Sequence, residues 1–317
     1  MFRYSKIAEA WKFLRCTNNV RNIILFATNR CCAKCKMCGI WEQRPKVDIP
    51  PYVLEDNLFR CKSVSGATIS LTGGEFVMHP KASEIVSLCR EHDLNVNMTT
   101  NGILTDKIEK IVREFEIRDV RVSLDGKPDT HDFIRGVNCY SNVIETIKRL
   151  RDFADIRINY TVCPWNSRED FLHVLRISHK YGVKVGVVVY EDVKAFDTKF
   201  AQRAYYDISD LIEDEEERMF FLYYSKWLNG FRLPCLSIRG TTLIMPNGDV
   251  LLCHCKDIVL GNIYEQTFDD IWYSKKRREI VKRFTTCNDC WGHCHRMIDL
   301  AIYRKYRFLV ILFKVLR

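Results

Sequence analysis

The chain has 317 residues, of which 47% are apolar and 28% charged, with a net charge of +9 at pH 7. These proportions are ordinary for a globular protein and exclude a largely disordered chain or a small disulfide-stapled domain. The length allows one full α/β domain plus a smaller one, and the mild positive charge permits an anionic partner without requiring one.

Residues 1–20 are predicted to form a helix that leads into the first strand. No apolar stretch with a small-residue cleavage site follows the N-terminus, so no secretory signal is expected. Fifteen cysteines at close spacings indicate metal binding rather than a disulfide framework. We therefore expect a cytoplasmic protein in a reducing compartment.

The first strand, expected at residues 23–26, leads into a loop that carries Cys31, Cys35 and Cys38. The spacing Cys-x3-Cys-x2-Cys can hold three irons of a cubane cluster and leave the fourth iron open. The alternatives are a zinc site, which needs four ligands, or a group of core cysteines. Cys32 falls outside the spacing and is interpreted as a bystander.

With Met37 before the last cysteine, this loop resembles the radical S-adenosylmethionine (AdoMet) superfamily. The resemblance implies a [4Fe–4S] cluster on Cys31, Cys35 and Cys38 whose open iron is chelated by the amino and carboxylate groups of AdoMet. It also implies that an electron from the cluster cleaves AdoMet to a 5′-deoxyadenosyl radical, and that a donor such as flavodoxin or ferredoxin supplies this electron.

Strand-then-helix units continue to residue 191, which is typical of a parallel sheet with helices outside. Six such units match the partial (β/α)6 barrel of the superfamily. The strand at residues 68–72 ends in Gly73, Gly74 and Glu75, where two glycines let the backbone approach a ligand and a carboxylate suits an amine. The resemblance assigns these three residues to the AdoMet amino group.

Later strand ends supply further candidates for AdoMet binding. Ser123 and Asp125 end a strand, where a β/α barrel has its active site, and both can hydrogen-bond ribose hydroxyls. Arg135, in a His-Asp-x-x-Arg-Gly segment of the kind found in relatives, is expected either to pair with a carboxylate or to form a surface salt bridge. The remaining predicted AdoMet contacts are Met37, Asn101, Asn159 and Val187.

Residues 192–230 lose the strand–helix rhythm and are predicted to form a charged helical connector. Its acidic run, residues 213–217, is interpreted as a solvated helix face because consecutive carboxylates point around a helix rather than converge. Gly230 is expected to end this helix.

A second cysteine set occupies residues 231–295. A Pro-Asn-Gly-Asp turn predicts a hairpin with Cys235 and Cys253 at its two ends, and a helix at residues 268–283 leads to a third cysteine group. This order resembles the SPASM or twitch extension of radical AdoMet enzymes, which implies an auxiliary [4Fe–4S] cluster. The predicted ligands are Cys235, Cys253, Cys287 and Cys290, with Cys294 as a further candidate.

The last group reads Cys-x2-Cys-x3-Cys, which is shorter than the SPASM pattern, so a second complete auxiliary cluster is doubtful. A ligand choice that involves Cys255, His254 or His293 stays open. A structural zinc ribbon is the alternative for this set.

The C-terminal residues 296–317 combine apolar and basic side chains, and their uninterrupted apolar run, residues 308–313, is too short to cross a bilayer. A basic amphipathic helix that touches the membrane surface and a helix that packs on the barrel or on another subunit both stay open.

The predicted function is a radical AdoMet enzyme that abstracts hydrogen from a substrate carbon. Resemblance to the family allows peptide modification, dehydrogenation of a small molecule, or rearrangement of a lipid or glycan precursor. The alternative is a non-catalytic iron–sulfur or zinc-binding scaffold. We expect no nucleic-acid partner, because no concentrated basic patch accompanies stacking aromatic residues outside the tail.

Overall fold

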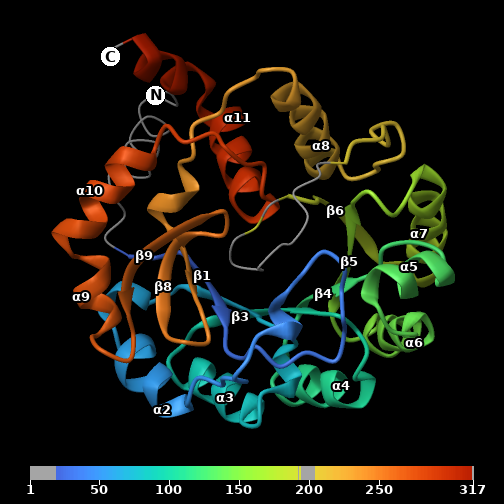
Figure 1. The fold of residues 1–317 in the computed structure, drawn as a ribbon, viewed down its shortest axis with the longest axis horizontal. Coiled ribbons are helices and arrows are strands. Elements are labelled where there is room, and N and C mark those ends of the chain that lie inside the picture. Colours follow the sequence, from blue (N-terminus) through green and yellow to red (C-terminus); the bar gives the residue numbers. More distant parts are fainter. Residues whose placement is uncertain (1–18, 192, 194–203, 316–317) are drawn as a thin grey trace, which may run out of the picture.

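A computed structural model describes residues 19–191, 193 and 204–315, so the predicted N-terminal helix lies almost entirely outside the described residues. Six parallel strands follow one another across a curved sheet, and helices connect them on its outer side (Figure 1). The predicted partial (β/α)6 barrel is confirmed. Its strands are β1 (Asn22–Phe26), β2 (Thr68–Thr72), β3 (Asn95–Thr100), β4 (Asp119–Ser123), β5 (Asp155–Val162) and β6 (Lys184–Val189).

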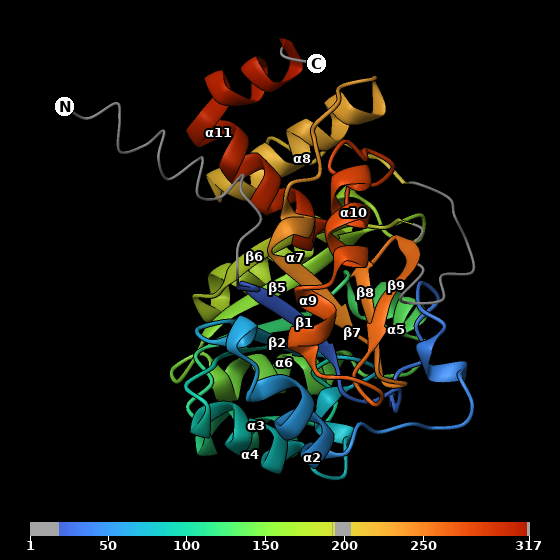
Figure 2. The same cartoon turned by 90° about the vertical axis from the view of Figure 1, so that its left-hand side faces the viewer.

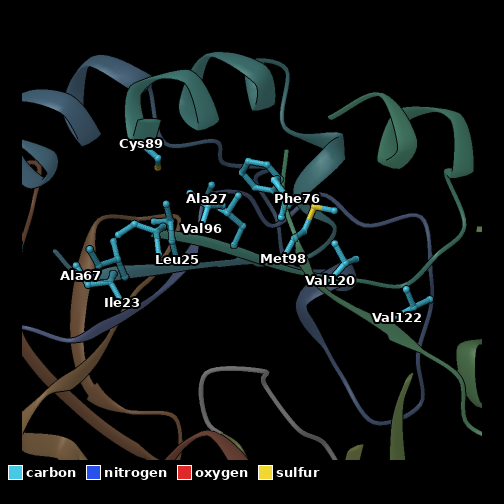
Figure 3. Packing of buried hydrophobic residues seen from close by; sticks show 14 of the residues in the cluster. Ile23, Leu25, Ala27, Ala67, Phe76, Cys89, Val96, Met98, Val120 and Val122 are labelled. Atoms are coloured by element: carbon cyan, nitrogen blue, oxygen red, sulfur yellow. The ribbon is translucent and has the colours of Figure 1, made fainter. Parts of the chain in front are cut away.

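The outer face of this sheet packs against the connecting helices. Leu25, Met98 and Val120 are fully buried on β1, β3 and β4, and Figure 3 shows them on the side of the sheet that the helices cover, near Phe76 and Cys89. Burial of this apolar surface stabilises the fold by about 25 cal/mol per Å². The covering helices are α2 (Pro51–Leu54), α3 (Ala82–Glu91), α4 (Thr105–Glu114), α5 (Pro128–Arg135), α6 (Tyr140–Leu150) and α7 (Arg168–Tyr181).

Successive residues of a strand point to opposite faces, and the inward residues of β2 to β5 are largely polar, whereas β1 and β7 place Ile24, Phe26 and Leu243 in a small apolar cluster. The polar inward residues are only partly buried, and they include Ser70, Asn97, Ser123 and Asn159. The sequence therefore builds a dry outer layer and a polar concave side that can hold a ligand.

The C-terminal cysteine region continues the same sheet. Strand β7 (Thr241–Ile244) pairs in parallel with β1, and β8 (Asp249–Cys253) and β9 (Lys256–Asn262) follow in antiparallel order. The predicted hairpin is present, and Gly248 adopts a φ of +85° in its turn. A third strand, absent from the prediction, extends it. The hairpin is joined to the barrel through the β1–β7 pairing.

Four more helices complete the structure: α8 (Glu215–Leu228), α9 (Phe268–Trp272), α10 (Lys275–Phe284) and α11 (His293–Val315). Helices α8 and α11 lie side by side at the open side of the barrel (Figures 1 and 2). The helix predicted at residues 296–317 is the continuation of α11. Helix α11 begins at His293 and has no break at residue 295, where the second cysteine region was expected to end. Within the described ranges, none of the helices is both long and apolar enough to cross a membrane.

The interpretation of the acidic run as a solvated face is wrong for one of its members. Glu217 is only 1% exposed. Its carboxylate accepts hydrogen bonds from Arg157 at 2.9 Å and from the Val187 amide at 2.9 Å, and it pairs with His293 at 3.1 Å. Glu217 therefore joins the connector, the last barrel strand and the C-terminal region. The other glutamates of the run are exposed, as predicted.

Candidate functional site

The loop that carries Cys31, Cys35 and Cys38 follows β1 directly and is fastened by its backbone. The Lys34 amide donates to the Arg135 carbonyl at 2.8 Å, and the Lys36 amide donates to the Ile134 carbonyl at 2.9 Å. A Cβ on Gly136 would stand 2.4 Å from the Lys34 carbonyl oxygen, and this glycine has a φ of +67°. The end of α5 therefore holds the cysteine loop, a role that sequence reasoning missed although the glycine after Arg135 was its signal.

The two glycines after β2 hold the same loop from its other side. The Gly74 amide donates to the Thr28 carbonyl at 2.9 Å, and the Glu75 amide donates to the Arg30 carbonyl at 2.7 Å. A Cβ on Gly74 would lie 2.2 Å from the Arg30 oxygen. The close approach that the sequence predicts for Gly73 and Gly74 is thus made, in part, to the cysteine loop itself.

The Glu75 carboxylate is buried next to this loop. It accepts hydrogen bonds from the Thr100 hydroxyl and from the Asn101 amide, both at 2.8 Å. Burial raises the pKa of Glu75 to about 7. Burial also raises the pKa of the Cys31 thiol, and the Glu75 charge adds to this shift, so the two groups are electrostatic neighbours. A cation that entered here would stabilise both groups in their charged forms.

Asn101 contacts two sulfurs with one amide nitrogen. Its Nδ2 lies 3.8 Å from the Cys31 Sγ and 3.4 Å from the Cys32 Sγ. Its Oδ1 accepts from the Ile103 amide at 3.0 Å, which fixes the orientation of the side chain. Asn101 therefore reaches the cysteine loop, and the loop places Cys32 beside Cys31.

Arg135 forms a buried ion pair rather than a surface salt bridge. Its Nε and Nη2 donate to one oxygen of Asp125 at 2.7 and 2.6 Å. Its Nη1 lies 3.7 Å from the Cys35 Sγ. Both side chains are at least nine-tenths buried. A guanidinium fixed in this way places a positive charge against one of the predicted cluster ligands.

The other predicted AdoMet contacts lie at different depths. Ser123 and Asn159 face each other across the β4–β5 pairing and are half-buried on the inner side of the sheet. Met37 packs against Ile134. Val187 is fully buried in the core, and Glu217 accepts a hydrogen bond from its amide. Direct contact of each of these residues with AdoMet stays a prediction.

The donor chemistry of the three cysteines fits an iron–sulfur cluster better than zinc. Sulfurs that share one tetrahedral zinc stand about 3.8 Å apart, as follows from a zinc–sulfur distance near 2.3 Å. Across the described residues, the one group of three ligand atoms within 4.8 Å of one another is His131, Asp132 and Cys139. Neither cysteine set brings three sulfurs that close together among these residues, and three cysteines suit three irons of a cubane, whereas a structural zinc takes four ligands.

The His131, Asp132 and Cys139 group has a structural explanation. One Asp132 oxygen accepts from the Cys139 and Tyr140 amides, both at 2.8 Å, and so satisfies backbone donors at the start of α6. His131 accepts from the Asp125 amide at 3.1 Å through Nδ1. The His131 Nε2 in turn lies 3.4 Å from the Cys139 Sγ, so these side chains contact one another and the nearby backbone.

The second cysteine set lines a cavity of about 360 Å³, a volume that includes the solvent at its mouth. The cavity brings together the four predicted ligands of the auxiliary cluster and adds Cys255 and His295. Cys294 is exposed and does not line this cavity. Its position therefore does not favour the prediction that it is a cluster ligand. The sulfur-bearing residues of the wall are Cys235, Cys253, Cys255, Cys287 and Cys290.

A buried ion pair supports the wall of this cavity. Arg296 lines the cavity and donates to Asp299 at 3.0 Å. The second oxygen of Asp299 accepts from the Leu236 and Ser237 amides, both at 2.8 Å, and so fixes the segment that carries Cys235. Burial raises the pKa of Asp299 to about 6. The arginine charge beside several thiols favours an anionic occupant.

Comparison with known families gives two matches. The Radical SAM superfamily matches residues 25–178, and the iron–sulfur cluster-binding domain called SPASM matches residues 235–294. The first region contains the barrel strands β2 to β5 and the cysteine loop, and the second contains every lining cysteine of the cavity.

Individual relatives are distant. A probable GTP 3′,8-cyclase of Thermococcus kodakarensis is 26% identical over 62% of this chain and 66% of its own length. The sporulation killing factor maturation protein SkfB of Bacillus subtilis is 23% identical over 77% of this chain and 62% of its own length. The chain thus spans just under two thirds of each. Streptococcus suis SuiB bound to its precursor peptide SuiA superposes with a TM-score of 0.66 at 17% identity, covering 90% of this chain and 72% of SuiB.

Proposed function

Because this chain belongs to the radical SAM superfamily and carries a C-terminal SPASM domain, we propose that it cleaves AdoMet reductively and abstracts a hydrogen atom from a carbon of its substrate. A radical SAM enzyme of this type uses a [4Fe–4S] cluster with AdoMet and an auxiliary cluster. The two cysteine sets supply the donors for both. Which residues hold which group is part of the proposal.

The observation that carries the proposal is the Glu75 carboxylate, buried beside Cys31 and clamped to the cysteine loop through Gly74. A scaffold that only binds metal has no need of a buried acid at this place. Glu75 would accept a hydrogen bond from the iron-bound AdoMet amino group, and its burial would strengthen this contact. When bound, the cluster supplies the electron that splits the AdoMet sulfonium to a 5′-deoxyadenosyl radical.

The remaining residues of the site orient AdoMet and balance charge. Cys31, Cys35 and Cys38 would hold three irons, and the Arg135 guanidinium would offset the negative charge at Cys35. Hydrogen bonds to a ligand sulfur and burial are levers on a cluster's reduction potential. Ser123 and Asn159, on the polar inner face, would contact the ribose and the amino acid part of AdoMet. Asp125 would serve through its pairing with Arg135.

Cys235, Cys253, Cys287 and Cys290 are the proposed auxiliary ligands. All four line one cavity, and Arg296 contributes a positive charge to its wall. Four thiolates would satisfy the four irons of one cubane.

A peptide is the substrate class that we favour. SkfB is named for the maturation of a killing factor, and the SuiB structure contains a precursor peptide. The GTP 3′,8-cyclase relative keeps a small molecule as the second candidate. Helices α8 and α11 lie at the open side of the curved sheet (Figure 1).

An electron donor such as flavodoxin or ferredoxin, a cytoplasmic location and contact of the C-terminal helix with a membrane surface stay predictions.

Electron–nuclear double resonance tests the proposal directly. Anaerobically reconstituted protein, reduced with dithionite, would be mixed with AdoMet that carries nitrogen-15 in its amino group. We expect a nitrogen coupling to the cluster in the parent and in Cys32→Ala, and none in Cys35→Ala. A cluster that shows no coupling in the parent would support the scaffold alternative.

A further inference from the structure

The auxiliary cavity contains one sulfur donor more than a cubane cluster needs. Five cysteines line it, whereas four irons take four protein ligands. The additional thiol belongs to Cys255. The inference below rests on the proposed auxiliary cluster and concerns what this fifth thiol does.

Cys255 lies in the tight turn between β8 and β9, whose last register pair is Cys253 with Lys256. The turn therefore presents two thiols, those of Cys253 and Cys255, from one short segment. The Cys255 Sγ is the nearest atom to a Cβ placed on Gly292, at 4.0 Å. It thus lies against the segment that follows Cys290.

Two contacts hold this turn against the loop that carries Cys287 and Cys290. The Cys255 and Cys290 side chains line the same cavity and lie close enough to interact. One residue further along each segment, the Lys256 ammonium pairs with Asp289 at 2.6 Å. The fold therefore places the Cys255 and Cys290 sulfurs next to each other.

We infer that Cys255 is an exchangeable ligand of the auxiliary cluster that can replace Cys290 on the same iron. In the exchange, the iron–sulfur bond to Cys290 would break and one to Cys255 would form, and a proton would leave the Cys255 sulfur and join the Cys290 sulfur. No electron is gained or lost.

The test uses the full chain with Cys31, Cys35 and Cys38 changed to alanine, so that iron and paramagnetic signals report on the auxiliary cluster alone. Onto this background come Cys255→Ala, Cys290→Ala and the double variant. Cys294→Ala is the matched control for a cysteine outside the cavity, and Cys287→Ala is the control for a ligand without a spare. Each is reconstituted anaerobically, assayed for iron, and then oxidised with ferricyanide.

We expect about four irons per chain in the background, in both single variants and in Cys294→Ala. The double variant and Cys287→Ala should lose roughly one iron on oxidation and show the electron paramagnetic resonance signal of a [3Fe–4S] cluster. The same positions are also changed to serine, and far-ultraviolet circular dichroism is recorded for each variant. An unchanged spectrum shows that the loss of iron does not come from misfolding.

Loss of the fourth iron in Cys290→Ala alone, or its retention in the double variant, would overturn the exchange and leave the auxiliary cluster in place. A background protein that binds no iron would overturn the auxiliary cluster and the exchange with it.

Discussion

At the scale of single residues, Glu75 connects the sequence motif to the chemistry. The Gly-Gly-Glu pattern predicts a carboxylate near an amine, and the structure adds the surroundings: burial, two hydrogen bonds and the nearby Cys31. Burial is the first cause of the raised pKa of Glu75, about 7. The AdoMet-free protein therefore carries this group half protonated near neutral pH.

AdoMet affinity should consequently depend on pH. The N–H bonds of the iron-bound amino group favour the ionised carboxylate as acceptor, so binding tightens as pH rises through about 7, by roughly tenfold between pH 6 and 8. Glu75→Gln removes the charge and should weaken binding by roughly 1.5–3 kcal/mol and flatten the profile. Anaerobic equilibrium dialysis with labelled AdoMet measures both. Glu84→Gln, an exposed glutamate, is the control, and an unchanged pH profile in Glu75→Gln would contradict this role.

Some residue contacts were beyond sequence reasoning. The approach of Asn101 to Cys31 and Cys32, and of Arg135 to Cys35, joins segments 69 to 100 residues apart. Motifs named these residues as AdoMet contacts, but only the folded arrangement shows that they also touch cluster ligands. For Cys294 the short Cys-x3-Cys spacing suggested a ligand, and the start of α11 leaves its side chain exposed.

At the scale of elements, the cysteine loop is positioned by two others: the turn after β2 and the end of α5. Gly74→Ala tests the first. Its Cβ would meet the Arg30 carbonyl at 2.2 Å, and backbone has to move to relieve that contact. We expect a loss of about four irons per chain after reconstitution, because the loop no longer presents its thiols together.

Gly66→Ala is the matched control for Gly74→Ala. A Cβ at Gly66 meets nothing within 4 Å, although its φ of +71° makes alanine cost roughly 1–2 kcal/mol. Iron content should stay at the parent value in this variant. If Gly74→Ala keeps its full iron content and still binds AdoMet, the loop is not fixed by this contact.

The connector helix α8 is docked by Glu217. Glu217→Ala would leave Arg157, His293 and the Val187 amide without this partner, which should cost roughly 2–4 kcal/mol of stability. Thermal unfolding of the metal-free protein measures the cost, with the exposed Glu216→Ala expected within about 0.5 kcal/mol of the parent. Equal melting temperatures for the two variants would refute the docking role.

The pH dependence of this contribution has a defined sign. Burial alone would raise the pKa of Glu217, but the hydrogen bond to His293, the hydrogen bond from the Val187 amide and the Arg157 charge together bring it below its usual value. A lowered folded-state pKa means that the stabilisation is present above about pH 4.5 and is lost as pH falls through the folded value. The difference between parent and Glu217→Ala should shrink accordingly in acid.

At the scale of the whole molecule, one nine-stranded sheet connects both cysteine regions. Strand β1 leads into the first cysteine loop, and its neighbour β7 begins the hairpin that carries Cys253 and Cys255. The Phe26 ring at the end of β1 lies 6.4 Å from the His254 ring, centroid to centroid. The two proposed cluster sites are therefore parts of one packed unit.

Strand–helix alternation and the hairpin turn were enough to predict the barrel and the strands around Gly248. The parallel pairing of β1 with β7 was not predictable, because it joins residues more than 200 positions apart and leaves no periodic signal in the sequence. The acidic run shows the same limit. Its exposed members follow the helix pattern, and the buried Glu217 is explained only by partners from β5, β6 and α11.

The central claim is that the iron left open by Cys31, Cys35 and Cys38 binds AdoMet and delivers the electron that cleaves it. Its most direct test is 5′-deoxyadenosine, measured by liquid chromatography and mass spectrometry after anaerobic incubation of the reconstituted protein with AdoMet and dithionite. We predict 5′-deoxyadenosine and methionine from the parent and from Cys32→Ala, and neither from Cys35→Ala or Cys38→Ala. A parent protein with its full iron content that leaves AdoMet intact would contradict the claim.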